Sequence, residues 1–315
     1  MASIVRSFTE NYGQKGFSEE VDKWLLMKDP ITTTMILVAY LAFVLKIGPS
    51  LMKNRQAMEL RKSMIAYNGV QVLFSMFLIW KSLEVKIPLR SMFSPSCSQN
   101  LEYTNETRLQ FAEASWWYHF AKMTEFLDTI FFVLRKRNRQ ISFLHVYHHS
   151  VTMYFSWLFL KYTPSEQGAI VGLINSLVHV VMYTYYMIAA MGPSYQKYIW
   201  WKKYMTVIQL VQFCIIIAYL SLLSLSNCGH SKFVTQFFIV NAFIFLYMFL
   251  DFYRKAYNKS TKSLSLAGGA LKKTATNGSI PKTSSKGFVG DNEAYLQISK
   301  DADLINKAEQ MCKVE

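Results

Sequence analysis

Three charged residues recur at every third position inside an otherwise apolar stretch of this sequence. Lys122, Glu125 and Asp128 lie in the segment Lys-Met-Thr-Glu-Phe-Leu-Asp-Thr. On a helix, residues three apart sit on adjacent turns, where opposite charges can pair. Each charge left unpaired inside a bilayer would cost about 2.5 to 3.5 kcal/mol on an insertion scale, so such groups are functional candidates by default. The alternative is an ion pair that only joins helices, which would not need three charges.

Three histidines open the next apolar stretch. His145, His148 and His149 belong to the segment His-Val-Tyr-His-His. At about 3.6 residues per turn they share one face of a helix. Neutral imidazole is a base, a nucleophile and a metal ligand, and three imidazoles on one face in a membrane seldom serve structure alone. This face is therefore the main candidate for catalysis.

A third apolar stretch adds a polar and aromatic stripe. Asn175, His179 and Tyr183 recur at spacings of four residues along one helical face. An aromatic stripe is more often packing than a site. Asn175 and His179, however, need polar partners at membrane depth, because no water is present there to hydrogen-bond them.

Long apolar blocks must position these residues. The chain of 315 residues is 52% hydrophobic and 16% aromatic, which is too apolar for an ordinary soluble domain. Its apolar residues gather into about seven blocks of roughly twenty, each long enough to cross a bilayer as a helix. The blocks lie near residues 31–51, 64–83, 114–134, 142–161, 168–191, 204–226 and 233–253. The sequence thus predicts an all-α, multi-pass membrane protein.

Composition divides the chain into three segments. Residues 1–30 are polar and mixed, without a basic start followed by an apolar core and a cleavage site, so we expect no removable signal peptide. Residues 31–258 form the seven-helix membrane domain. Residues 259–315 are rich in Lys, Ser, Thr, Gly and Asn and cannot bury enough apolar surface to fold, which predicts a disordered tail.

The formal charge of +14 follows membrane topology rather than nucleic-acid binding. Basic residues cluster in the connections after the first, third, fifth and seventh blocks, which all lie on one side. They are Lys53, Arg55, Arg61, Lys62, Arg135, Lys136, Arg137, Arg139, Lys197, Lys202, Lys203, Arg254, Lys255 and Lys259. The positive-inside rule makes this side cytosolic, with the amino terminus in the lumen and the tail in the cytosol. A second role as a phosphate-binding rim is compatible with this topology.

Depth in the bilayer places the polar residues in one band. Measured from the cytosolic end of each helix at about 1.5 Å per residue, Asp128 and His148 lie roughly 9 Å deep. Glu125 lies roughly 14 Å deep, and Lys122 and His179 lie roughly 18 Å deep. Three helices therefore supply acid, base and histidine at similar heights, which predicts a site that is reached from the cytosol.

Two cysteines fall in loops that this topology assigns to the oxidising lumen. Cys97 follows the second block and Cys228 follows the sixth. We predict a disulfide between them, and the alternative is two unpaired lumenal thiols, because sequence alone does not give their separation.

One glycosylation site is expected. Asn105 lies in Asn-Glu-Thr on the lumenal side, whereas Asn258 and Asn277 lie in similar sequons on the cytosolic side. We expect glycan on Asn105 alone, because the glycosylation enzymes act in the lumen. A mobility shift on deglycosylation that Asn105→Gln removes would verify this. Glycan on Asn258 or Asn277 would contradict the topology.

Four motifs together resemble the very-long-chain fatty-acid elongase family from the first block to the last. They are Lys-x-x-Glu-Phe-Leu-Asp-Thr at 122–129, His-Val-Tyr-His-His at 145–149, Asn-Ser-x-x-His with Met-Tyr-x-Tyr-Tyr at 175–186, and Thr-x-x-Gln-Leu-x-Gln at 206–212. The resemblance implies a helical bundle around an acyl tunnel in the endoplasmic reticulum. The implied reaction joins acyl-CoA and malonyl-CoA to give 3-oxoacyl-CoA, carbon dioxide and CoA.

The resemblance also implies site residues and partners. Substrate-binding residues would be Lys122, Glu125, Asp128, Asn175, Tyr183 and Gln209. Reductases and a dehydratase of the same membrane would complete the elongation cycle. We expect no metal and no cofactor beyond the two CoA substrates, and no nucleic-acid partner.

Condensation needs an activated acyl group and an enolate from malonyl-CoA. Histidine can carry an acyl group, because neutral imidazole is nucleophilic and forms a reactive adduct. We assign this role to His148, with His179 assisting transfer and His145 and His149 orienting or protonating it. Lys122, Glu125 and Asp128 would set protonation or stabilise the enolate. Acyl chain length depends on side chains that only a tertiary structure can place.

Two other classes of protein compete with this interpretation. A membrane di-iron desaturase or hydroxylase also uses histidine clusters, which bind metal through imidazole nitrogen. This chain has 6 histidines, and His119 and His230 fall outside the clusters, which leaves too few for the usual set. A seven-span receptor or channel without chemistry would leave the histidine face unexplained.

Overall fold

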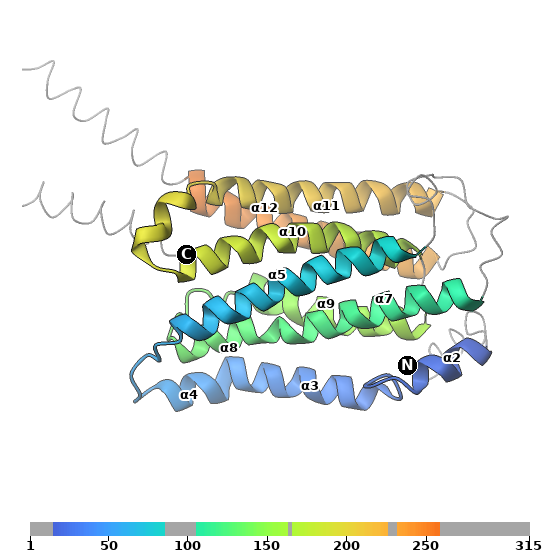
Figure 1. The fold of residues 1–315 in the computed structure, drawn as a ribbon, viewed down its shortest axis with the longest axis horizontal. Helices are drawn as coiled ribbons and strands as arrows, with labels where there is room; N and C mark the ends of the chain where they lie inside the picture. The colour runs from blue at the N-terminus through green and yellow to red at the C-terminus, as the bar shows by residue number, and fades with distance from the viewer. Residues whose placement is uncertain (1–14, 86–104, 163–165, 226–231, 259–315) are drawn as a thin grey trace, which may run out of the picture. The chain divides into compact units, whose positions relative to one another are not determined.

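The structure is a computed structural model, and it describes residues 15–85, 105–162, 166–225 and 232–258. Every regular element within these ranges is helical, which confirms the predicted all-α class (Figure 1). The chain divides into two units, Met1–Phe249 and Leu250–Glu315. Of the second unit, the structure describes only the last residues of α12 and the π-helix Arg254–Asn258.

Among the described residues, five helical segments are long and apolar enough to cross a membrane. They are Pro30–Met52 (α3 to α4), Arg61–Glu84 (α5), Gly168–Ala190 in α10, Lys202–Leu225 (α11) and Thr235–Ala256, which begins in α12. Each coincides with a predicted block, so the multi-pass architecture is confirmed. The other two blocks are also helical, but 114–134 is divided between two helices, Asn105–Thr124 (α7) and Phe126–Leu134 (α8), and 142–161 carries three histidines. The count of seven spans stays a prediction.

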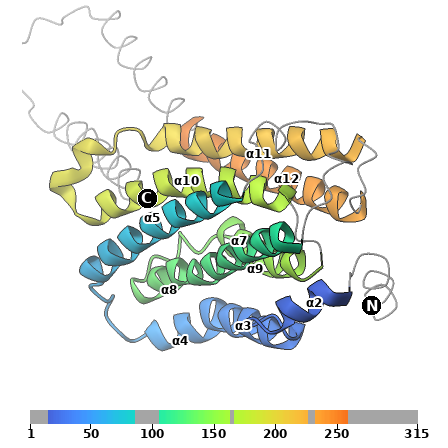
Figure 2. The same ribbon diagram turned by 45° about the vertical axis from the view of Figure 1, so that its right-hand side comes forward.

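Within the first unit the helices pack along one another, as Figures 1 and 2 show from two directions. The helix α5 packs along most of α10 (Glu166–Ala190). Beside them, α7 (Asn105–Thr124) packs against α9 (Phe143–Tyr162). A cluster of buried side chains, Ile216, Leu220 and Ala242, joins α11 to α12 (Lys232–Tyr253).

One helix breaks at Glu125, and this break positions the polar residues. The helix α7 ends at Thr124 and α8 (Phe126–Leu134) begins just beyond. The Asp128 amide donates to the Glu125 carbonyl at 3.1 Å, a tight turn instead of α-helical spacing. The Thr124 carbonyl accepts instead from the Tyr67 hydroxyl at 3.3 Å, and the Gln71 amide donates to the Thr124 hydroxyl at 3.0 Å. Polar groups of α5 thus stabilise the break.

The segment before α3 is attached to the end of α9. The Lys161 ammonium donates to the Asp22 carboxylate and, at 2.9 Å, to the Met27 carbonyl. The Trp157 indole donates to the Leu26 carbonyl at 2.9 Å. Asp29 then begins α3 as an N-cap, because its carboxylate accepts from two amides of the first turn. These bonds fix the end of α9 that lies farthest from the three histidines.

Candidate active site

A buried ion pair forms the centre of the polar cluster. The Lys122 ammonium lies 2.8 Å from Glu125 Oε1, and each side chain is only 2% exposed, so the predicted pairing is present. The ammonium also donates to Asn175 Oδ1 at 2.8 Å, and the Tyr118 hydroxyl donates to the same oxygen at 2.9 Å. Asn175 thereby has the polar partners that its place in the sequence required.

Two histidines from different helices approach the Glu125 carboxylate. His179 Nδ1 of α10 lies 3.2 Å from Oε1, and His149 Nδ1 of α9 lies 3.8 Å from Oε2. Glu125 Oε2 and His149 Nδ1 are buried and have no hydrogen-bond partner among the described residues. A buried polar atom without a hydrogen-bond partner is costly and rare. These two atoms therefore mark a place where a proton or a polar group of the substrate can be bound.

Asp128 and His145 belong to a second group of contacts. The Tyr183 hydroxyl donates to Asp128 Oδ2 at 2.9 Å. His145 Nε2 lies 2.9 Å from the Thr129 hydroxyl, which also bonds the Tyr40 hydroxyl at 2.8 Å. Equal depths were predicted for Asp128 and His148, but Asp128 contacts Tyr183, whereas His148 lines the cavity described below. Glu125, not Asp128, is the carboxylate beside the histidines.

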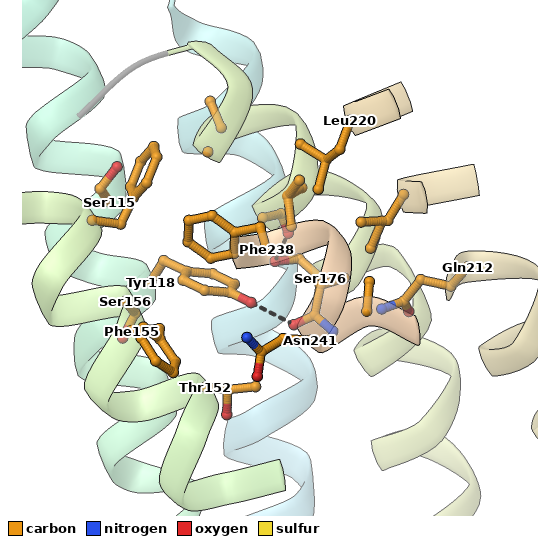
Figure 3. Close-up of a pocket in the computed structure, with 18 of the residues that line it drawn as sticks. Ser115, Tyr118, Thr152, Phe155, Ser156, Ser176, Gln212, Leu220, Phe238 and Asn241 are labelled. Atoms are coloured by element: carbon orange, nitrogen blue, oxygen red, sulfur yellow. Dashed lines mark hydrogen bonds between the residues drawn. The ribbon is translucent and has the colours of Figure 1, made fainter. Parts of the chain in front are cut away.

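A cavity of about 160 Å³ lies beside this cluster and is lined by helices α5, α7, α9, α10, α11 and α12. One stripe of α9 faces it at spacings of four, three and four residues: His148, Thr152, Phe155 and Phe159. Figure 3 shows Tyr118, Phe155 and Asn241 pointing into this space. Asn175 also lines the cavity and so joins it to the Lys122–Glu125 pair.

His148 is the histidine that faces the cavity. Its ring packs against the rings of His149 and Phe245, with centroids 5.4 and 5.1 Å away. Among the described residues, none hydrogen-bonds its ring nitrogens. A neutral imidazole with a free nitrogen in the wall of a mostly apolar cavity has the properties of a nucleophile. His149 and His179 lie behind this wall, toward Glu125.

Gln212 of α11 lines the cavity, although it was not predicted as a substrate-binding residue. Its side chain is 6% exposed, and no described residue hydrogen-bonds its amide. Gln209, which was predicted to bind substrate, does not line the cavity, and its amide contacts the Met182 sulfur at 3.6 Å. Both glutamines belong to one motif. Helical spacing shows that they face different directions but not which of them faces inward.

Cys97 and Cys228 lie outside the described residues, and Asn105 is the first residue of α7. The disulfide and the glycosylation therefore stay predictions. Among the described residues, no three His, Cys, Asp or Glu side chains are arranged to hold one metal ion.

The chain is similar to known proteins over most of its length. The model of the family described as "ELO: GNS1/SUR4 family" matches residues 25–265. A very long chain fatty acid elongase of Aedes aegypti is 40% identical over 253 residues, 80% of this chain and 70% of the relative. Very long chain fatty acid elongase 7 of Rattus norvegicus is 40% identical over 267 residues, 84% of this chain and 91% of the relative. For elongase 4 of Homo sapiens the identity is 39% over 261 residues, 82% and 80% of the two chains.

Proposed function

This chain belongs to the ELO family and is a membrane-embedded fatty-acid elongase, and on that premise we propose that it catalyses the condensing step of elongation. As an acyltransferase, a 3-oxoacyl-CoA synthase, it would join a long-chain or very-long-chain acyl-CoA to malonyl-CoA. The products are 3-oxoacyl-CoA, carbon dioxide and CoA. The observation that carries this proposal is that His148 faces a mostly apolar cavity beside a buried Lys-Glu pair.

In the first step, a ring nitrogen of His148 attacks the thioester carbon. The carbon–sulfur bond breaks, and CoA leaves with the proton that the imidazole loses. The acyl group is then held on His148 with its tail in the cavity. This covalent route divides one difficult displacement into two easier ones.

In the second step, malonyl-CoA loses carbon dioxide and becomes an enolate. Its carbon attacks the acyl carbon on His148, a carbon–carbon bond forms, and the imidazole leaves and takes up a proton. His179 and His149 lie on the two oxygens of Glu125, which suits them to supply and store that proton. Lys122 favours the charged form of the carboxylate in this buried site.

Both steps develop negative charge on the acyl carbonyl oxygen. The Gln212 amide is buried, faces the cavity and has no described protein partner, so it is suited to donate to that oxygen. Asn241, which also lines the cavity, donates to the Phe237 carbonyl at 2.9 Å and is less available.

We place the enzyme in the endoplasmic reticulum, with the amino terminus lumenal and the carboxyl terminus cytosolic. The reductases and the dehydratase that complete the cycle would be its partners there. The chemistry described needs no cofactor beyond the two CoA substrates. The histidines are used here in acyl transfer, so neither a di-iron oxidation nor a receptor function is proposed.

The proposed reaction is tested with purified protein in lipid nanodiscs. Malonyl-CoA labelled in its free carboxyl carbon should release labelled carbon dioxide only when acyl-CoA is added. One 3-oxoacyl-CoA should form for each carbon dioxide released. Decarboxylation without acyl-CoA, or no product from any acyl-CoA under conditions where the protein is folded, would contradict the proposal.

Replacing Gln212 with leucine is expected to lower the turnover number by about 10- to 100-fold, because a donor to the developing oxyanion is lost. The Michaelis constant should change less, since the interaction strengthens in the transition state. The matched variant Gln209→Leu lies on the same helix but outside the cavity, and we expect a smaller loss from it. The reverse order of effects would restore Gln209 as the residue that contacts substrate.

A further inference from the structure

We propose that Phe159 and Gly168 together form the floor of the acyl cavity and set the longest acyl chain that the enzyme elongates. This inference rests on the proposed function, since it assigns the cavity to the acyl tail. It concerns the end of the cavity that takes no part in the chemistry.

The cavity has a polar end and an apolar end. His148, Gln212 and Asn241 line the first, and Phe159, Leu220 and Phe238 line the second, together with the small side chain of Ser115. From His148 to Phe159 the stripe of α9 advances about 16 Å at 1.5 Å per residue. In Figure 3 Leu220 lies at the opposite end of the pocket from Thr152. An acyl group attached at His148 therefore directs its methyl end toward Phe159.

At the apolar end the Phe159 ring lies directly on the backbone of Gly168. A Cβ atom built on Gly168 would overlap the outer atoms of that ring, so only glycine leaves it room. The ring also meets the Phe238 ring edge-on, with centroids 6.0 Å apart. Parts of three helices thus meet at the Phe159 ring, which lines this end of the cavity.

The two residues control length in opposite directions. Removing the Phe159 ring deepens the cavity by the volume of that ring and admits more methylene groups. A methyl group added at Gly168 would overlap the Phe159 ring and force it to move. The ring has space to move on the side that faces the cavity. The cavity then becomes shorter, while His148 and Glu125 keep their places.

The test measures elongation of a series of saturated acyl-CoAs that differ by two carbons, with each variant in nanodiscs. Two substrates are compared: the acyl-CoA two carbons longer than the longest one that wild-type enzyme elongates, and the acyl-CoA that wild-type enzyme prefers. In Phe159→Ala, the ratio of kcat/KM for the first to kcat/KM for the second should rise at least about tenfold, the scale on which hydrophobic pockets discriminate chain length. Gly168→Ala should shift the optimum to a shorter chain. Phe159→Leu should give an intermediate profile if the alanine variant does not fold.

The double variant Phe159→Ala/Gly168→Ala distinguishes an effect that Gly168→Ala exerts through the Phe159 ring from a nonspecific disturbance of the structure. If the methyl group acts through the ring, the effect of Gly168→Ala should vanish once the ring is absent. The control Phe243→Ala removes the same side chain from a position that is 52% exposed and outside the cavity, and its profile should match wild type.

Two failures remain distinguishable. If wild-type protein forms no 3-oxoacyl-CoA from any acyl-CoA, the proposed function fails. If wild-type protein is active but Phe159→Leu and Gly168→Ala elongate the same range of substrates as wild type, the proposed function is supported. The proposal that Phe159 and Gly168 limit the chain length is then wrong. If the effects of the two substitutions on chain-length preference are additive in the double variant, the proposal is also contradicted.

Discussion

Replacing His148 with alanine is expected to abolish both a covalent acyl intermediate and the 3-oxoacyl product. Wild-type enzyme given acyl-CoA without malonyl-CoA should release CoA and retain the acyl mass on the peptide that contains His148. Turnover should fall by at least about 10³-fold in the variant, as expected when a nucleophile is lost. Mass spectrometry of the peptide and a thiol assay for free CoA measure the two quantities independently.

The His148 variant should keep its fold, since the side chain faces a cavity and no described residue bonds its ring. An unchanged unfolding temperature would verify this. The alternative mechanism is direct attack of the enolate on bound acyl-CoA. It predicts no adduct, and no CoA release until both substrates are present. That result in wild-type enzyme would leave His148 as an acid, a base or an orienting group.

Replacing Lys122 with methionine is expected to be severe for both stability and activity. It leaves the Glu125 carboxylate buried with no cation at hydrogen-bonding distance other than a protonated histidine. Removing one partner of a buried ion pair typically costs about 3 to 5 kcal/mol. Thermal unfolding in nanodiscs should show a clear loss of stability, and the elongation assay should show little or no product.

A second variant distinguishes the effect of this ion pair on stability from its effect on activity. Lys122→Met/Glu125→Gln removes both charges at nearly constant volume, so much of the stability should return while activity stays absent. The control Lys23→Met breaks an exposed Lys-Glu pair of the same spacing, with Glu20, and should change neither property. If the single Lys122 variant were as stable as wild type, the carboxylate would not depend on this ammonium.

Helical periodicity did not predict the break at Glu125, and so it did not predict which neighbours Glu125 and Asp128 contact. The regular spacing of Lys122, Glu125 and Asp128 predicted one continuous face. The turn at Glu125 instead directs Glu125 toward His149 and His179, while Asp128 meets Tyr183. This turn depends on hydrogen bonds from α5, some fifty residues earlier in the chain, which local sequence does not reveal.

The sequence by itself determined the helical class, the membrane setting, the elongase family and most members of the polar cluster. These follow from composition, from the length of apolar blocks and from residue types whose burial in a bilayer demands a function. Only the tertiary structure decided which of His145, His148 and His149 faces the cavity, that Gln212 rather than Gln209 lines it, and that the Phe159 ring lies against Gly168 in its wall. Those choices depend on how each helix is rotated about its axis against its neighbours. Rotation is set by packing among residues far apart in the chain, which spacing along one helix does not contain.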